Sequence, residues 1–139
     1  MEHRGGCHCG NLRLTLRLTR APAEVRLRAC GCGFCRAHAT RTTSDPAGSV
    51  EIRVADPSLV ARYRFGSATA DFLICRRCGV YPGAICETAA GLRMVTNVNC
   101  LETRALFTAP PAPVDHDGEA TSDRMARRAA NWTPVVMAP

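Results

Sequence analysis

The chain of 139 residues contains no lysine, so all 18 of its basic side chains other than histidine are arginines. It also has no apolar run approaching the roughly 20 residues that cross a bilayer. No apolar stretch precedes the first cysteine, as it would in a secretory signal. These absences predict a cytoplasmic protein with no membrane partner. Its nine cysteines would then be reduced, which favours metal ligation over the alternative of disulfide pairing.

The arginines are also not clustered, since the longest runs are the pairs Arg76-Arg77 and Arg127-Arg128. The formal charge of +6 counts the cysteines as neutral. Seven cysteine thiolates holding two zinc ions would contribute −3 and lower the net charge to about +3. We therefore interpret the arginines as solvated faces and do not expect a nucleic-acid partner. Isolated arginines still suit small anionic ligands.

Alternating apolar residues predict a mainly β fold of short antiparallel strands. The clearest strand covers residues 11–19, where leucines at every second position alternate with arginine and threonine. Residues 25–29 alternate in the same way and lead to Cys30, so we expect a hairpin between the first two cysteine clusters. Further strands are expected at residues 49–54, 60–65, 71–74, 80–85 and 92–98.

Helix is expected in two places only. Residues 36–39 fit a single turn, and residues 123–130 fit one short C-terminal helix with Ser122 as its cap. The chain shows no repeat and no second core. We therefore expect residues 1–108 to form a zinc-binding β domain, and residues 109–139 to form a Pro-rich linker and a helical arm packed on that domain through Trp132.

Seven of the nine cysteines fall into three close clusters. They are Cys7-His8-Cys9, Cys30-Gly31-Cys32-Gly33-Phe34-Cys35 and Cys75-Arg76-Arg77-Cys78. Such C-x-C and C-x2-C spacings direct several sulfurs to one point, as tetrahedral zinc requires. The outer clusters each supply two ligands beside a glycine, Gly10 or Gly79. Together they fit a structural zinc that ties the N-terminal hairpin to the middle of the chain.

Cys30, Cys32 and Cys35 remain as a compact trio, and we expect Gly31 and Gly33 to let its backbone fold tightly. Two interpretations are open. A histidine, His38 or His8, would complete a closed and inert site. Otherwise the fourth position of a second zinc would hold water or an external thiol. Such a zinc would stabilise a bound thiolate and present it to an aldehyde carbonyl.

The three clusters, in their order and separation, resemble the signatures of the glutathione-dependent formaldehyde-activating family, which includes relatives of centromere protein V. Tyr63-Arg64-Phe65-Gly66-Ser67 and Asn97-Val98-Asn99-Cys100-Leu101 resemble further family segments. The resemblance covers roughly residues 5–107, and residues 117–134 look like a bacterial subgroup. Tyr81 stands where many relatives have histidine, and Gly31 where asparagine or histidine is common. Neither position is a zinc ligand.

The resemblance implies a zinc-stapled β-tent fold and two zinc ions per chain. It implies a structural site at Cys7, Cys9, Cys75 and Cys78, and a catalytic site at Cys30, Cys32 and Cys35. It further implies a carbon–sulfur lyase that condenses glutathione or a similar thiol with formaldehyde. The alternative is a non-catalytic zinc-stapled module that carries glutathione or binds a protein or nucleic acid.

Five further residues of interest lie outside the expected zinc ligands. Cys86 and Cys100 fit buried, inert cysteines. Tyr81, Arg36 and Arg76 lie near the zinc loops in the sequence. They are therefore candidates for contacts with an anionic thiol, although each fits an ordinary surface residue as well.

Overall fold

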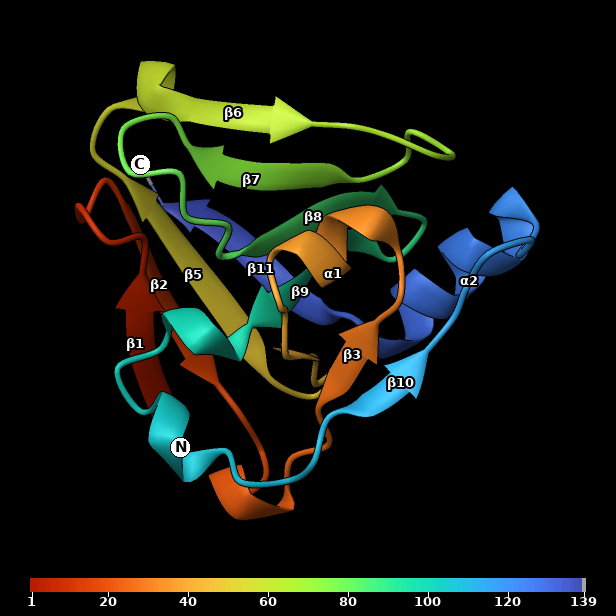
Figure 1. Ribbon diagram of the computed structural model, residues 1–139, viewed down its shortest axis with the longest axis horizontal. Coiled ribbons are helices and arrows are strands. Elements are labelled where there is room, and N and C mark those ends of the chain that lie inside the picture. Colours follow the sequence, from red (N-terminus) through yellow and green to blue (C-terminus); the bar gives the residue numbers. More distant parts are fainter. Residues whose placement is uncertain (139) are drawn as a thin grey trace.

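The computed structural model describes residues 1–138, which are mainly β, with 39% strand and 20% helix (Figure 1). This confirms the expected fold class. The strands are β1 (Glu2–Gly6), β2 (Leu12–Arg17), β3 (Arg28–Cys30), β4 (Thr42–Thr43), β5 (Ser49–Val54), β6 (Val60–Tyr63), β7 (Asp71–Cys75), β8 (Gly83–Thr88), β9 (Gly91–Asn97), β10 (Ala112–Val114) and β11 (Thr133–Ala138). The α-helices are α1 (Gly33–Ala37) and α2 (Thr121–Asn131). Four short 3-10 turns lie at Pro22–Glu24, Pro57–Leu59, Val98–Cys100 and Arg104–Leu106.

The eleven strands found in residues 1–138 belong to one hydrogen-bonded sheet, and β11 connects its two parts. β1, β2 and β5 pair antiparallel on one side, while β6, β7, β8 and β9 form an antiparallel series on the other. The last four residues of β11 run parallel to β5, and its first two residues pair antiparallel with β9. The C-terminal strand therefore joins the two antiparallel groups (Figure 1).

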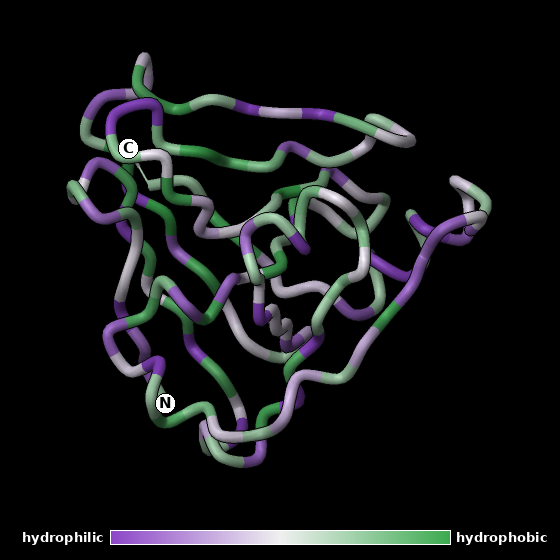
Figure 2. Tube along the Cα trace, in the orientation of Figure 1, coloured by the Kyte–Doolittle hydropathy of each residue, from purple (hydrophilic) through white to green (hydrophobic). Residues whose placement is uncertain are grey.

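The alternation in residues 11–19 produces the expected strand. Leu12, Leu14 and Leu16 of β2 are buried, whereas Arg13 and Arg17 are exposed. β5 presents Val50 and Ile52 to the same core, and its bounds are those expected from the sequence. The tube in Figure 2 shows this alternation of apolar and polar residues along the chain. Burial of one face of each strand therefore fixes the pairing register.

The expected hairpin between the first two cysteine clusters is wrong. β2 pairs with β1 and β5, whereas β3 pairs with β4 and β10. Residues 22–24 form a 3-10 turn, and β3 begins only at Arg28. The side chains of Val25 and Leu27 are buried, but these two residues do not belong to a strand. The strand that precedes the first cysteine cluster, β1, was not expected.

The C-terminal segment contributes more than a linker and a helical arm. It supplies the helix α2, as expected, but also the strands β10 and β11. Ala120 is the N-cap residue of α2 and no side chain caps it, so the expected cap by Ser122 is wrong. Trp132 is 6% exposed and packs with Tyr81 and Val95 in a second apolar cluster. Its expected role as an apolar anchor is confirmed.

None of the helices within residues 1–138 is both long enough and apolar enough to cross a membrane.

Candidate metal centres and the adjoining pocket

The first metal centre is formed where two hairpin turns meet. Cys7 and Cys9 lie in the turn between β1 and β2, whereas Cys75 is the last residue of β7 and Cys78 lies between β7 and β8. Their four Sγ atoms all lie within 4.8 Å of one another. Cys9 Sγ is 3.7 Å from Cys7 Sγ and 3.5 Å from Cys75 Sγ. A tetrahedral zinc with bonds of about 2.3 Å has its sulfurs about 3.8 Å apart, so these sulfurs match a zinc site.

Local backbone geometry holds these cysteines in place. Both turns end in a glycine with positive φ, +88° at Gly10 and +78° at Gly79, which glycine adopts without the cost that a Cβ brings. The backbone amide of Leu12 donates to Cys7 Sγ at 3.2 Å. Gly6 (φ +143°) approaches the Leu12 carbonyl so closely that a Cβ would overlap that oxygen. Both outer cysteine pairs therefore lie beside tight turns that contain a glycine, as expected.

The sulfurs of this centre differ in proton affinity. Burial raises the pKa of Cys7 to about 11. At Cys78 burial acts in the same direction, but hydrogen bonds from the backbone amides of Cys9 and Val80 outweigh it and hold the pKa at about 6. A cation favours the thiolate form of all four sulfurs. A bound metal would therefore stabilise this group of converging thiols, of which Cys7 and Cys75 are buried.

The second metal centre comes from a single loop. Cys30 ends β3, Cys32 is the N-cap of α1, and Cys35 lies within α1. Their Sγ atoms lie within 4.8 Å of one another. The backbone amide of Cys35 donates to Cys32 Sγ at 3.4 Å. A hydrogen bond from the Cys35 thiol lowers the pKa of Cys30 to about 5, while the same bond and burial raise the pKa of Cys35.

One expectation for this trio does not hold, and one of its two open interpretations is not supported. Gly31 and Gly33 have no positive φ, and a Cβ at either would meet only ordinary contacts or open space. The loop therefore does not require glycine at these positions. His8 and His38 are exposed and belong to neither group of converging ligand atoms. The His38 ring instead packs on Phe34 at 4.5 Å between centroids, so the closed site is not formed in the described chain.

All nine cysteines lie in the described residues and none is in a disulfide, so the disulfide alternative is not realised. Cys86 is 2% exposed and belongs to neither metal group, as expected of a buried cysteine. Cys100 is partly buried, donates to the Tyr81 carbonyl at 3.4 Å and also lies outside both groups. Burial raises the pKa of Cys100 to about 11, which keeps its thiol protonated and unreactive at neutral pH.

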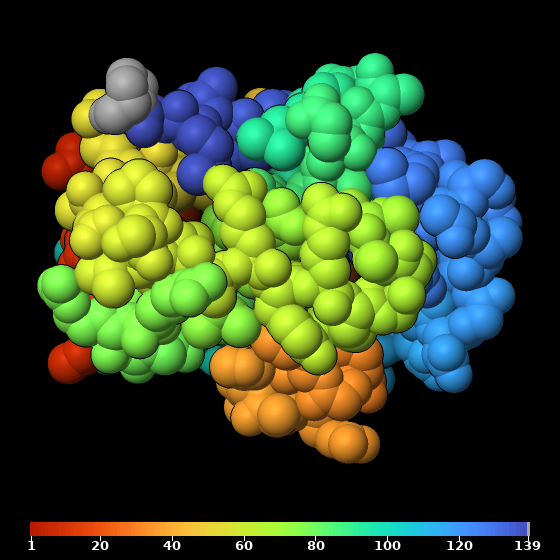
Figure 3. Space-filling model, turned by 90° about the horizontal axis from the view of Figure 1, so that it is seen from above, coloured from red at the N-terminus to blue at the C-terminus, as the bar shows by residue number. Residues whose placement is uncertain are grey.

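The trio lies in the wall of a pocket of about 800 Å³. The first cluster does not line this pocket. The other walls come from the loop that ends β6, from β7, from the segment after β10 and from α2. In Figure 3 the α1 segment (orange), the β6–β7 segment (yellow-green) and the α2 segment (blue) adjoin on one face of the molecule. The second cysteine group thus borders a pocket that a small molecule can enter.

Aromatic side chains form one side of the pocket. Phe65, Phe72, Tyr81 and Trp132 line it, and Phe34 contacts Tyr81 edge-on at 4.8 Å. Burial, helped by the nearby cysteine sulfurs, raises the pKa of Tyr81 well above its ordinary value, so its hydroxyl stays protonated. Of the three contact candidates chosen from the sequence, only Tyr81 lines the pocket; Arg36 and Arg76 do not.

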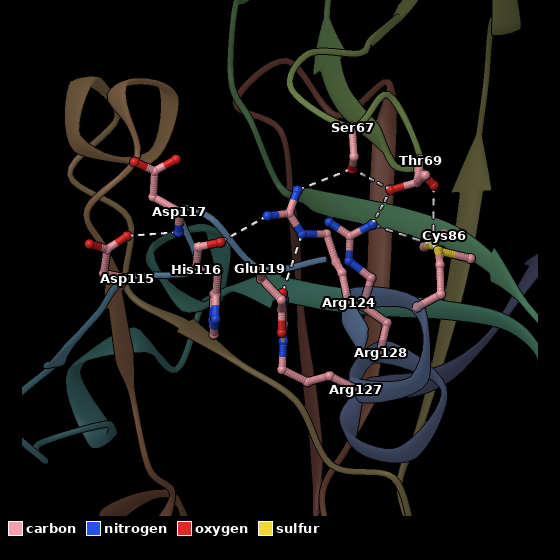
Figure 4. Close-up of polar contacts among 11 residues, drawn as sticks. Ser67, Thr69, Cys86, Asp115, His116, Asp117, Glu119, Arg124, Arg127 and Arg128 are labelled. Atoms are coloured by element: carbon pink, nitrogen blue, oxygen red, sulfur yellow. Dashed lines mark hydrogen bonds and ion pairs between the residues drawn. The ribbon is translucent and has the colours of Figure 1, made fainter. Parts of the chain in front are cut away.

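The pocket also contains basic residues that the sequence did not single out. They are Arg28, His116, Arg124, Arg127 and Arg128. Figure 4 shows how the arginines of α2 reach their partners. Arg124 donates to Ser67 Oγ at 3.1 Å and to the His116 carbonyl at 2.9 Å. These contacts join α2 to the loops that border the pocket.

Glu119 anchors the start of α2 through Arg127 at 3.0 Å and Arg124 at 3.3 Å. The hydrogen bonds from Arg127, acting against burial and supported by those from Arg124, hold the pKa of Glu119 at about 2. Because this pKa lies below the ordinary value of 4.5, the ion pairs stabilise the fold fully above pH 4.5. Their contribution is lost as the pH falls towards 2.

We therefore expect Glu119→Gln to lower the free energy of unfolding at pH 6 and to have progressively less effect between pH 4.5 and pH 2. Urea unfolding followed by the fluorescence of Trp132, the single tryptophan, measures this difference at each pH. Glu102→Gln is the matched control, because Glu102 is 65% exposed in its pair with Arg13 and such pairs contribute little. An effect of Glu119→Gln that does not change with pH would contradict this account.

The chain matches no family model. The fold is similar to that of a Rhodobacter sphaeroides protein whose crystal structure was determined by structural genomics. The two chains share 25% sequence identity at a TM-score of 0.56, over 79% of this chain and 97% of that one. This similarity supports the fold and assigns no activity.

Proposed function

We propose that the protein is a zinc-dependent enzyme of the carbon–sulfur lyase type. It would form or break the adduct between glutathione, or a similar small thiol, and an aldehyde such as formaldehyde, in a reducing cytoplasm. The observation that supports this proposal is the contrast between the two cysteine groups. One has four sulfurs and lies outside the pocket, whereas the other has three and forms part of the pocket wall.

The donor sets fit zinc. Seven soft sulfur ligands in one group of four and one of three are typical of zinc and of few other common metals. When bound at the trio, zinc would keep the sulfur of a ligand thiol in its nucleophilic thiolate form. Cys30, Cys32 and Cys35 would hold the ion at the pocket wall, where the aromatic side chains leave room for the aldehyde.

The bond changes are simple. The thiolate lone pair forms the new carbon–sulfur bond, the π pair of the carbonyl moves to oxygen, and that oxygen takes up one proton. In the reverse direction the hydroxyl loses its proton, the carbonyl re-forms and the carbon–sulfur bond breaks. His116 and the protonated Tyr81 hydroxyl line the same pocket. They are this chain's candidates for handling the proton.

The test is the rate at which ¹³C-formaldehyde and glutathione form S-hydroxymethylglutathione, followed by exchange NMR. We expect the protein to accelerate the exchange above the spontaneous rate, and a chelator to remove this acceleration. If glutathione binds but exchange stays at the spontaneous rate, the protein is a non-catalytic carrier and the enzymatic proposal is wrong.

A further inference from the structure

Arg128 is a buried cation that has no carboxylate partner. It is 8% exposed, lines the pocket and takes part in none of the ion pairs within residues 1–138. Neither of its hydrogen-bond partners is a carboxylate: Nη1 donates to Thr69 Oγ1 at 2.8 Å and to Cys86 Sγ at 3.7 Å (Figure 4). A buried charge without a partner destabilises a fold. A residue kept in that state is therefore a candidate for binding a ligand of opposite charge.

The free part of Arg128 is the part that recognises carboxylates. Nε is buried without a hydrogen-bond partner, and Nη2 donates to no residue of the described chain. The Nε–Nη2 edge of a guanidinium presents two parallel N–H groups, which match the two oxygens of a carboxylate. The Trp132 ring lies 4.9 Å from the guanidinium carbon. This contact, together with the Thr69 hydrogen bond, holds the guanidinium in a fixed orientation.

The surrounding charges leave this end of the pocket positive. Arg28 also lines the pocket and donates to a neutral group, Ser44 Oγ, at 2.7 Å. Arg124 and Arg127 share the single carboxylate of Glu119. Burial lowers the pKa of Arg128, the contact with Cys86 acts in the opposite direction, and the charges of Arg127 and Arg124 lower the pKa further. The positive charges here therefore repel one another, and a bound anion would relieve that repulsion.

Two carboxylates, those of Asp115 and Asp117, also line the pocket, but they do not neutralise these arginines. Both residues are exposed, on the loop that leads to α2. Neither forms an ion pair with a described residue, and Asp115 Oδ1 accepts a hydrogen bond from the Asp117 backbone amide at 2.8 Å (Figure 4). Neither carboxylate therefore occupies the buried Arg128 or the half-buried Arg28.

We propose that Arg128, assisted by Arg28, binds a carboxylate of the substrate and thereby selects thiols that carry a carboxylate over neutral thiols. This inference rests on the proposed function for the position of the thiol sulfur at the trio. It adds the substrate class and a second anchoring point. The sulfur lies at one wall of the pocket, the carboxylate lies at the arginines, and the aromatic wall contacts the atoms between them.

Isothermal titration calorimetry with three probes tests this assignment. The probes are 3-mercaptopropionate, which has both groups, 2-mercaptoethanol, which has only the thiol, and succinate, which has only carboxylates. We expect Arg128→Gln to weaken the binding of 3-mercaptopropionate and succinate by about tenfold or more, and to change that of 2-mercaptoethanol less than twofold. Arg104→Gln, which removes an exposed arginine outside the pocket, should leave all three unchanged.

The probes separate this inference from the proposed function. If succinate binding depends on Arg128 while neither thiol binds through its sulfur, the carboxylate site stands and the thiol chemistry is wrong. If the wild-type protein does not bind succinate, or Arg128→Gln weakens all three probes equally, the carboxylate assignment is wrong. Circular dichroism checks the fold of each variant. If Arg128→Gln does not fold, Arg28→Gln is expected to produce the same selective loss, and its absence would overturn the assignment.

Discussion

Replacement of Cys9 by serine is expected to lower the melting temperature of the zinc-loaded protein by at least about 10 °C, which corresponds to roughly 3 kcal/mol for a domain of this size. Cys9 is exposed, so its side chain contributes little packing to the core. Substitution of an exposed residue ordinarily changes stability by less than about 0.5 kcal/mol. A large effect at this position therefore reports a ligand bond and not a loss of burial.

The connectivity of the first centre explains why the loss is large. Cys9 and Cys75 are 66 residues apart in the sequence, so the metal closes a long loop and restricts the unfolded chain. Because metal binding requires the folded turns, its free energy adds directly to the stability of the fold.

Differential scanning calorimetry with and without a chelator measures this effect. The matched control is Cys100→Ser, which changes a cysteine outside both groups and retains a donor for the Tyr81 carbonyl. In the chelated protein, Cys9→Ser should lower the melting temperature little further, because the metal–sulfur bond that the substitution removes is already lost. A Cys9→Ser variant as stable as the wild type would show that the four thiols hold no structural metal.

Replacement of Cys30 by serine is expected to abolish the thiol–aldehyde activity and leave the fold intact. We expect the rate of adduct formation to fall at least about a hundredfold, because a metal that activates a nucleophile contributes several kcal/mol to lowering the barrier. The melting temperature should fall by less than about 3 °C. The three ligands come from residues 30–35 of one loop, so this metal closes no long stretch of chain.

The exchange rate of labelled formaldehyde, together with the metal content of the purified variant, measures both effects. Cys30→Ser should retain one metal per chain and the wild type two. Cys100→Ser again serves as the control and should keep both the activity and the metals. An active Cys30→Ser variant would contradict the catalytic assignment of the trio, whatever its metal content.

Parts of the fold were predictable because burial leaves a local pattern in the sequence. The alternating leucines of β2 and the alternation in β5 reflect strands with one buried face. β11 lacks such a pattern, since its sequence begins with Thr133-Pro134 and continues with apolar residues of which Val136 is 61% exposed. Its place between β5 and β9 depends on residues about 40 and 85 positions earlier in the chain, which no local pattern reveals.

The candidate site, like the fold, was predictable from the sequence only in part. Close cysteine spacings identify the ligands of both centres, because neighbouring residues on one tight turn must point to one place. The arginines of the pocket carry no such signal. Arg127-Arg128 reads as a solvated pair in the sequence, yet Arg128 is buried because α2 packs against β8 and β9. Only the packing of the helix distinguishes the two residues.

X-ray absorption at the zinc edge, with and without glutathione, tests the account most directly. We expect two zinc ions per chain with four and three sulfur ligands, an average of 3.5 per zinc. Glutathione should raise this average towards four, and should not do so in Cys30→Ser. One zinc per chain, or a sulfur count that glutathione leaves unchanged, would contradict the proposal that the three-cysteine centre binds the thiol substrate.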